Sequence, residues 1–208
     1  MSVAAAFDPF AARLSAFGAW FGARSIRAGD ETAFRDAELE STPANLARRR
    51  ASGAARLLAA HMFARLGLDD AKVGRAVGGA PAWPTGLIGS IAHDETTAIV
   101  AFARAGGAIK ALGVDIEPAE PLPDDLADYV LTQDERRSFA GDPLAGRMIF
   151  AAKEAVYKAV YPLDGAAPDY ADILCDAQMS AATLRDGRRL ALVTAVAPRV
   201  LAAAFLLS

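Results

Sequence analysis

One short segment, Gly113-Val114-Asp115-Ile116-Glu117, constrains the fold of this chain more than any other. Side chains alternate between the two faces of a β-strand, so the segment predicts a strand that turns Val114 and Ile116 toward a core. Asp115 and Glu117 then share the opposite face, about 6.6 Å apart along the strand. Two carboxylates at this spacing, with the Ile116 carbonyl between them, can bind one divalent cation. The same pattern by itself also suits an ordinary strand with one solvated face.

A second segment, Phe150–Lys158, predicts a helix that carries Glu154 and Lys158 on one face. Residues four apart on a helix are neighbours. Glu154 could then supply a third carboxylate to the cation, and Lys158 could bind a phosphate one turn away. An exposed ion pair of small energetic value explains the same spacing without any function.

Composition limits the kind of metal site that the chain can build. It has 208 residues, of which 53% are hydrophobic, with one cysteine, Cys175, and two histidines, His61 and His93. These numbers exclude an intrachain disulfide, a cysteine-bound zinc and a histidine-rich site. A hard cation would therefore need carboxylate ligands. The net charge of −3 argues against a nucleic-acid partner.

Neither end of the chain resembles a targeting or membrane segment. Residues 1–10 contain Asp8 and Pro9 in place of a basic region followed by an apolar run. The apolar stretch at 200–207 is much shorter than the roughly 20 residues that cross a bilayer. We therefore expect no transmembrane segment and a cytoplasmic location.

The secondary-structure signals alternate between long helices and short strands. Thr42, with Pro43 at the first helical position, predicts a helix that ends near Gly67, and Gly53 inside it suggests close approach of another segment. Thr132 and Glu135 have capping-box spacing. Further signals predict a helix from Asp142-Pro143 to Tyr161 that Pro162 ends, strands at Leu87–Ile91, Thr97–Ala103 and Ala111–Ile116, and a hairpin at Arg185–Arg188.

These elements predict an α+β fold of two similar lobes related by a pseudo-twofold axis. Each lobe would pack a long helix on a small antiparallel sheet, with residues 1–112 in the N-terminal lobe and 113–208 in the C-terminal lobe. Both lobes lie in one chain, which favours a monomer.

A glycine- and proline-rich stretch before Gly89-Ser90 suits a bound phosphate. Small residues let a ligand approach the backbone closely, and Ser90 and His93 can donate hydrogen bonds to it. His93 equally suits a structural role at a strand end, and Trp83 suits core anchoring. Upstream, Arg48 and Arg56 belong to an arginine-rich helix, which is either a solvated face or a source of phosphate ligands.

Taken together, four motifs resemble the 4′-phosphopantetheinyl transferase superfamily, in particular its monomeric type found in enterobactin-synthetase component D and the mycobacterial enzyme. The likeness runs from about Arg48 to Tyr161. The motifs are Pro81-Ala82-Trp83-Pro84-Thr85-Gly86, Gly89-Ser90-Ile91-Ala92-His93, Gly113-Val114-Asp115-Ile116-Glu117 and Ala152-Lys153-Glu154-Ala155-Val156-Tyr157-Lys158-Ala159.

The resemblance implies coenzyme A bound in a cleft between the lobes, with magnesium or manganese as the cation. It places the metal ligands on Asp115, Ile116, Glu117 and Glu154, and the catalytic residues on Glu154, Lys158 and Asp115. The expected contacts to coenzyme A fall on Arg48, Arg56, Gly78, Gly79, Ala80, Pro81, Ser90, Ala92, His93, Lys153 and Lys158. Gly78-Gly79 stands where the family usually has Lys or Arg, and Arg75 is the alternative source of that contact.

The implied activity transfers the phosphopantetheine arm of coenzyme A to a serine of an apo carrier protein, acyl or peptidyl, with release of 3′,5′-ADP. Fatty-acid, polyketide and siderophore-peptide carriers all remain open. Two other hypotheses also fit the residues. One is a magnesium-dependent phosphohydrolase that uses water as nucleophile, and the other is a non-catalytic coenzyme A binding protein.

Overall fold

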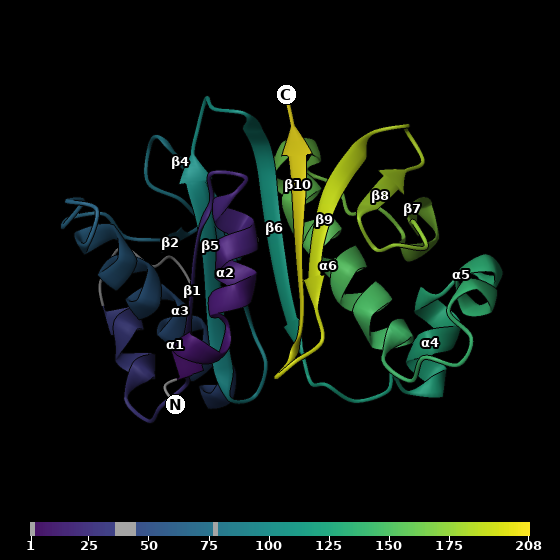
Figure 1. The fold of residues 1–208 in the computed structure, drawn as a ribbon. Coiled ribbons are helices and arrows are strands. Elements are labelled where there is room, and N and C mark those ends of the chain that lie inside the picture. Colours follow the sequence, from purple (N-terminus) through teal and green to yellow (C-terminus); the bar gives the residue numbers. More distant parts are fainter. Residues whose placement is uncertain (1–2, 36–44, 77–78) are drawn as a thin grey trace. The chain divides into compact units, whose positions relative to one another are not determined.

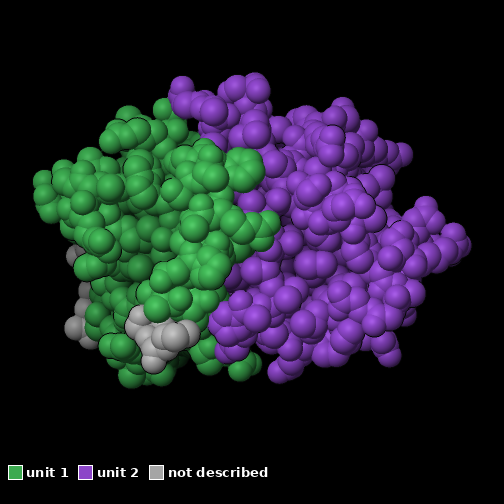
Figure 2. Space-filling view, viewed as in Figure 1, with its two compact units in different colours: residues 1–105 green, residues 106–208 purple. Residues whose placement is uncertain are grey.

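The computed structural model describes residues 3–35, 45–76 and 79–208, and its backbone divides into two compact units. Figure 2 colours them: unit 1 is residues 1–105 and unit 2 is residues 106–208. Both combine helices with antiparallel sheets, which confirms the predicted α+β class. The lobe boundary expected between residues 112 and 113 falls inside strand β6 (Ile109–Glu117).

Unit 1 is built around β5 (Thr97–Arg104), whose nearly continuous apolar run makes it a central strand. β5 pairs with β1 (Trp20–Ser25) on one side and β4 (Leu87–His93) on the other. The long helix α3 (Leu46–Ala64) packs on this sheet through Ala55, Leu58 and Phe63 against Val100 and Phe102. The remaining elements of unit 1 are α1 (Val3–Ala6), α2 (Asp8–Ser15), η1 (Asp30–Arg35), β2 (Gly74–Arg75) and β3 (Pro81–Ala82).

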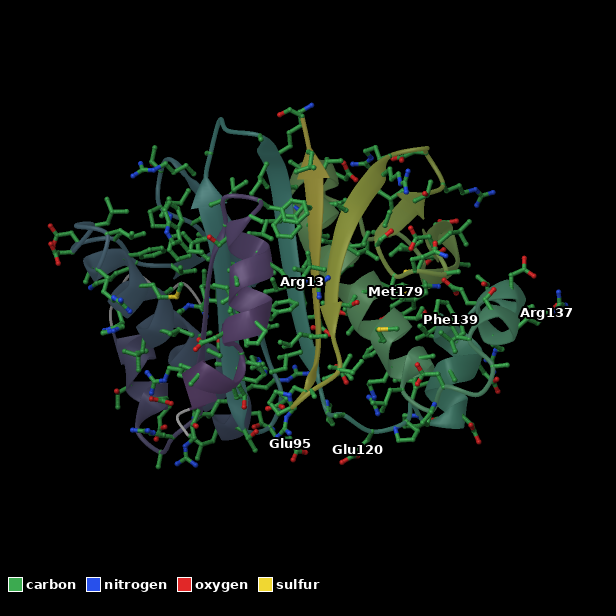
Figure 3. All side chains as sticks on the ribbon, viewed as in Figure 1. Arg13, Glu95, Glu120, Arg137, Phe139 and Met179 are labelled. Carbon is green, nitrogen blue, oxygen red and sulfur yellow. The ribbon has the colours of Figure 1, made fainter. Side chains whose placement is uncertain are left out.

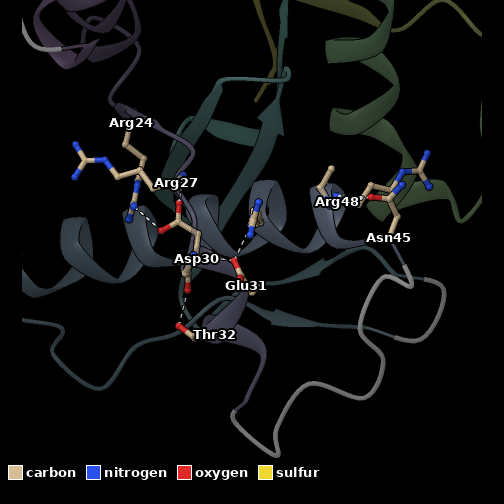
Figure 4. Close-up of polar contacts among 10 residues, drawn as sticks. Arg24, Arg27, Asp30, Glu31, Thr32, Asn45 and Arg48 are labelled. Carbon is tan, nitrogen blue, oxygen red and sulfur yellow. Dashed lines mark hydrogen bonds and ion pairs between the residues drawn. The ribbon is translucent and has the colours of Figure 1, made fainter.

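The N-terminal part of α3 differs from its sequence-based description. The predicted cap Thr42 and Pro43 lie outside the described residues. Among the described residues Asn45 caps the helix, because its side chain accepts hydrogen bonds from the backbone of Ala47 and Arg48 (Figure 4). The expected close approach at Gly53 is confirmed, since a Cβ there would overlap the backbone oxygen of Asp30 in η1.

Unit 2 contains a five-stranded antiparallel sheet in the order β6-β10-β9-β8-β7 (Figure 1). The long helix α6 (Ala145–Asp164) packs on it, and Phe139 packs against the same core, which includes Met179 (Figure 3). The other elements are α4 (Asp124–Val130), α5 (Gln133–Ser138), η2 (Tyr170–Asp172), β7 (Ile173–Cys175), β8 (Ala181–Leu184), β9 (Arg189–Ala195) and β10 (Val200–Leu207).

The predicted elements are present, with ends that lie within three residues of those predicted; the long helix, for example, begins at Ala145 and not at Asp142-Pro143. The three predicted strands are present as β4, β5 and β6, and the hairpin joins β8 to β9. Both halves of the capping box between Thr132 and Glu135 are formed. The prediction that Pro162 ends the long helix is wrong, because α6 continues to Asp164. A proline in the last turn costs little more than one backbone hydrogen bond, and the left-handed Gly165 ends the helix instead.

Strand β1 is an element that the sequence patterns do not predict. It pairs with β5 along its whole length, from Trp20 opposite Phe102 to Ser25 opposite Thr97.

In the described part of the chain, no helix combines the length and the apolar character needed to span a membrane.

Candidate active site

The candidate site in unit 2 depends on an unusually close contact between β6 and α6. A Cβ on Gly113 would overlap the Ala155 carbonyl oxygen and lie 2.6 Å from the Ala159 nitrogen. Glycine at this position therefore lets the helix backbone rest directly on the strand. Side chains that follow Gly113 on the same strand face, Asp115 and then Glu117, are brought to the surface of α6.

Asp115 lies in this contact and is 5% exposed. Its Oδ1 accepts a 2.5 Å hydrogen bond from Lys158 Nζ, which forms an ion pair across the contact. Its Oδ2 is buried and has no hydrogen-bond partner among the described residues. A buried carboxylate oxygen left unsatisfied is costly, so this atom is a candidate ligand for a cation.

The electrostatics of Asp115 and Lys158 are strongly perturbed. Burial raises the pKa of Asp115, and the attraction of Lys158 offsets only part of this effect. Burial lowers the pKa of Lys158, but Asp115, Glu154 and Glu117 outweigh burial and raise that pKa overall. Lys158 is therefore a permanently charged ammonium within the field of three carboxylates.

Glu117 is held by an arginine that the sequence analysis does not identify. Arg147, near the start of α6, donates from Nη1 to Glu117 Oε2 at 2.8 Å. It also donates to the carbonyl oxygens of Glu120 and Pro121, in the connection after β6. Burial and the charge of Asp115 raise the pKa of Glu117 to about 7, although Arg147 acts in the opposite direction.

Glu154 has a third kind of partner. The hydroxyl of Tyr170, in η2, donates a short hydrogen bond to Glu154 Oε1. The Tyr170 ring packs edge-on against Tyr129 of α4, with ring centroids 5.5 Å apart. Burial, and then the contact with Glu154, raise the pKa of Tyr170, so the phenol remains a hydrogen-bond donor.

Helical spacing accounts for much of this arrangement. Arg147, Glu154 and Lys158 are separated by seven and four residues, which places them on one stripe of α6. Arg147 could therefore have been recognised from its spacing to the predicted pair. Tyr170 has no comparable signal, because it lies in a short turn beyond the helix.

The three carboxylates have the donor chemistry of a magnesium site but are each directed to a protein donor. Asp115 binds Lys158, Glu117 binds Arg147 and Glu154 binds Tyr170. Across the described ranges, no three side chains of His, Cys, Asp or Glu are gathered closely enough to hold a metal ion. Hard oxygen ligands and the unsatisfied Asp115 Oδ2 fit a divalent cation. Ligation by Asp115, Ile116, Glu117 and Glu154 stays a prediction.

Lys153, expected to contact coenzyme A, lies in a different environment from Lys158. Its side chain is fully buried. Nζ donates to Glu135 Oε2 at 2.8 Å and to the carbonyl oxygens of Val130 and Tyr170 at 2.9 and 3.0 Å. An ammonium group has three donors, and these contacts engage all of them. We therefore do not retain Lys153 as a phosphate ligand.

In unit 1, the predicted phosphate residues lie at the end of β4 and on α3. Ser90 and Ala92 are buried and share one face of β4, while His93 is exposed at its end. Next to His93, the Asp94 side chain accepts hydrogen bonds from the backbone of Thr96 and Thr97, which forms the turn into β5.

Arg48 and Arg56 lie on one face of α3, eight residues apart. Arg48 is exposed, whereas Arg56 is 6% exposed and donates to Ser52 and to the Gly74 carbonyl oxygen. Burial and the nearby charge of Arg75 lower the pKa of Arg56 to about 10. Because the guanidinium groups of Arg56 and Arg75 repel each other, a bound anion between them would be favourable.

The predicted nucleotide loop is described from Gly79 onward, and Gly78 lies outside the described residues. Gly79 has a φ of 92°, and its backbone nitrogen donates to the Ala76 carbonyl oxygen. A Cβ on Gly79 would lie 2.6 Å from Arg75 Nη2, so the Arg75 side chain lies directly against this loop. Ala80 hydrogen-bonds to Ala76, and Pro81 pairs with Arg75 in the β2–β3 ladder. Arg75 therefore joins Arg56 beside the loop.

Comparison with known protein families finds two matches in this chain. Residues 37–103 match the 4′-phosphopantetheinyl transferase N-terminal domain, and residues 111–196 match the 4′-phosphopantetheinyl transferase superfamily. The chain belongs to the 4′-phosphopantetheinyl transferase superfamily.

The chain is also similar to individual proteins. The chain is 40% identical over 121 residues to 4′-phosphopantetheinyl transferase Svp of Streptomyces mobaraensis, a match that covers 55% of this chain and 49% of that protein. It is 33% identical to 4′-phosphopantetheinyl transferase PptT of Mycobacterium tuberculosis, over 48% of this chain and 45% of PptT. It is 40% identical to enterobactin synthase component D of Salmonella typhimurium, over 38% of this chain and 34% of that protein. The chain spans about half the length or less of these relatives.

Proposed function

We propose that this chain transfers the 4′-phosphopantetheine arm of coenzyme A to a serine of an apo carrier protein and releases 3′,5′-ADP. The observation that carries the proposal is the buried Asp115–Lys158 pair, with Glu117 and Glu154 in the same electrostatic field. Family membership and the names of the relatives support the same reaction.

In this reaction the serine hydroxyl oxygen forms a bond to the phosphorus that bears the pantetheine arm. The phosphoanhydride bond breaks, its electron pair leaves with 3′,5′-ADP, and the serine loses its proton. Positioning and charge neutralisation account for most catalysis of this kind. A divalent cation held by Asp115, Glu117 and Glu154 would neutralise charge on the pyrophosphate.

The chain's own residues would act on either side of this bond. Lys158 would place a fixed positive charge beside the pyrophosphate, and Asp115 keeps that ammonium in place. Glu154 is our candidate for the group that accepts the serine proton, directly or through water. Its Oε1 already accepts one hydrogen bond from Tyr170, which defines the orientation of the carboxylate.

Unit 1 would bind the nucleotide end of coenzyme A. The guanidinium groups of Arg48 and Arg56 suit the adenosine 3′-phosphate, with Arg75 adjacent to Arg56. The loop at Gly79–Pro81 would contact the nucleotide, and Ser90, Ala92 and His93 would line the pyrophosphate path. A monomeric state and a cytoplasmic location belong to this proposal.

The carrier would be an acyl or peptidyl carrier protein or domain. The relatives named enterobactin synthase component D support a siderophore-peptide carrier among the candidates.

Incubation of the purified chain with coenzyme A, Mg²⁺ and an apo carrier protein tests the proposal. Transfer predicts a carrier whose mass increases by one phosphopantetheine arm and an equal amount of 3′,5′-ADP. Release of 3′,5′-ADP without a modified carrier would identify a phosphohydrolase instead. Coenzyme A binding without either product would identify a non-catalytic binding protein.

A further inference from the structure

We propose that Tyr170 is a positioning residue that fixes the carboxylate of Glu154, and that Lys153 anchors Tyr170 for this purpose. The inference rests on the proposed transferase function and assigns a role to a tyrosine that lies outside the four motifs.

The first observation is the contact between Tyr170 and Glu154. The Tyr170 hydroxyl donates to Glu154 Oε1 from η2, a short turn between α6 and β7. Glutamate has three side-chain torsions, so a carboxylate that takes part in chemistry needs outside contacts to hold one orientation. The hydrogen bond engages Oε1 and so defines the direction in which the other carboxylate oxygen, Oε2, points.

The second observation is that the Tyr170 ring is held from two sides. Tyr129 of α4 packs edge-on against it, with an interplanar angle of 81°. Phe150, one turn before Glu154 on α6, lies with its ring centroid 6.1 Å from that of Tyr170. The ring therefore has a defined position relative to the helix that carries Glu154, and the hydroxyl is not free to follow a moving carboxylate.

The third observation is that the backbone of Tyr170 is tied down by Lys153. The buried Lys153 ammonium donates to the Tyr170 carbonyl oxygen, to the Val130 carbonyl oxygen and to Glu135 Oε2. Glu135 Oε2 is itself fixed, because it accepts hydrogen bonds from the backbone nitrogen and hydroxyl of Thr132 in the capping box. Two segments that are distant from Lys153 in sequence, residues 130–135 and the turn at Tyr170, thus meet at one ammonium group.

Lys153 and Glu154 are neighbours in the sequence, and both contact Tyr170. The two side chains hold opposite ends of the same tyrosine: Lys153 binds its backbone carbonyl, and Glu154 accepts its hydroxyl hydrogen bond. Lys153 therefore acts on Glu154 through Tyr170, without any contact with substrate. Supporting residues of this kind typically change metal affinity or activity by about 10- to 100-fold when they are removed.

Tyr170→Phe is the direct test, because it removes the hydroxyl and leaves the ring contacts with Tyr129 and Phe150. We expect kcat for carrier modification to fall about tenfold or more, with the KM for coenzyme A nearly unchanged. The affinity for Mn²⁺ in the presence of coenzyme A, measured by the loss of the free-ion EPR signal, should fall by about tenfold. The thermal unfolding midpoint should stay close to that of the wild type.

Tyr129→Phe is the matched control, since it removes the hydroxyl of the neighbouring, exposed tyrosine and keeps the same ring pair. It should behave like the wild type in all three measurements. If both tyrosine variants lose activity equally, the effect comes from the aromatic pair and not from the bond to Glu154, and the inference is overturned.

A second comparison shows whether Tyr170 acts through Glu154. In a Glu154→Gln background, Tyr170→Phe should weaken Mn²⁺ binding no further, because the two changes remove parts of one unit. Additive losses would overturn the inference.

The outcomes also separate this inference from the proposed function. A wild-type chain that modifies the carrier, with Tyr170→Phe equally active, keeps the function and overturns the role of Tyr170. A wild-type chain that binds Mn²⁺ and coenzyme A in a Tyr170-dependent way without modifying the carrier overturns the function alone. A wild-type chain that neither binds nor transfers overturns both.

Discussion

The two units differ in how they present the charged residues of the predicted site. In unit 2, Asp115 and Lys158 are paired in a buried contact between β6 and α6, and the two other carboxylates each bind a protein donor. In unit 1, Arg48 and His93 are exposed at separate elements, and Arg56 lies beside the like charge of Arg75. The predicted site residues of unit 2 therefore include opposite charges in direct contact, whereas those of unit 1 include arginines without a carboxylate among them.

The difference has an energetic consequence. Removing one member of a buried ion pair leaves an uncompensated charge and disturbs its neighbours. Removing one exposed cation from a phosphate site loses that contact and little else. Substitutions in unit 2 should therefore have larger effects than substitutions in unit 1, and on a different step of the reaction.

The largest effect is expected for the carboxylates of unit 2. Glu154→Gln, which removes the candidate proton acceptor, and Asp115→Ala, which removes a predicted cation ligand and the partner of Lys158, should each reduce carrier modification by about a hundredfold or more. Carrier mass spectrometry at saturating coenzyme A measures this loss.

Glu120→Gln is the matched control for these variants, because the Glu120 side chain is exposed and lies just after the same strand. It should retain wild-type activity. Near-normal activity in either carboxylate variant would contradict the roles assigned to Asp115 and Glu154.

The next effect concerns the backbone contact that forms the unit 2 cluster. Gly113→Ala should lower the free energy of unfolding by about 2–3 kcal/mol, because its methyl group would overlap the backbone of α6. Urea unfolding measures this change. Gly74→Ala, in unit 1, is the control, since its Cβ would meet Ala82 Cβ at an ordinary 3.5 Å. Equal stability of the two variants would show that β6 and α6 can separate without cost.

The unit 2 cluster also shows which parts of the candidate site could be predicted from the sequence. Strand alternation predicted that Asp115 and Glu117 share a face, and helical spacing predicted that Glu154 and Lys158 share another. These periodicities are local, and both agree with the structure. The partners Arg147 and Tyr170 depend on which strand face meets which helix face, a tertiary property that no local period contains.

Lys153 shows the same limit from the opposite side. Its place in a motif beside Glu154 suggested a ligand contact, but neighbouring residues on a helix point in different directions. The structure places its ammonium in a buried network with Val130, Glu135 and Tyr170. Strand β1 could not be predicted from local patterns either, because it pairs with β5, which lies far away in the sequence.

The pH dependence of stability gives a third test of the unit 2 cluster. The pKa of Glu117 rises from 4.5 to about 7 in the folded protein, so the folded state holds this proton more tightly than the unfolded state. Between these values the folded state binds more protons, and the free energy of unfolding therefore falls as pH rises. The stabilisation is fully present below about pH 4.5 and is lost above about pH 7.

We expect this group to contribute about 2 kcal/mol across that window, allowing for its partial exposure. Urea unfolding of the metal-free protein from pH 5 to pH 8 measures the slope. Glu117→Gln should flatten it, whereas Glu120→Gln should not. The same slope in wild type and Glu117→Gln would assign the pH dependence to other groups.

The smallest effect is expected in unit 1, for Arg48→Ala. Loss of one charge-assisted phosphate contact should raise the KM for coenzyme A about tenfold and leave kcat nearly unchanged. The variant should lose no affinity for dephospho-coenzyme A, which lacks the 3′-phosphate. Arg65→Ala, at the other end of α3, is the control and should change neither constant. If Arg48→Ala reduced kcat as strongly as Glu154→Gln does, the separation between a nucleotide-binding unit 1 and a catalytic unit 2 would be wrong, because the exposed arginine would then act on the reacting phosphate.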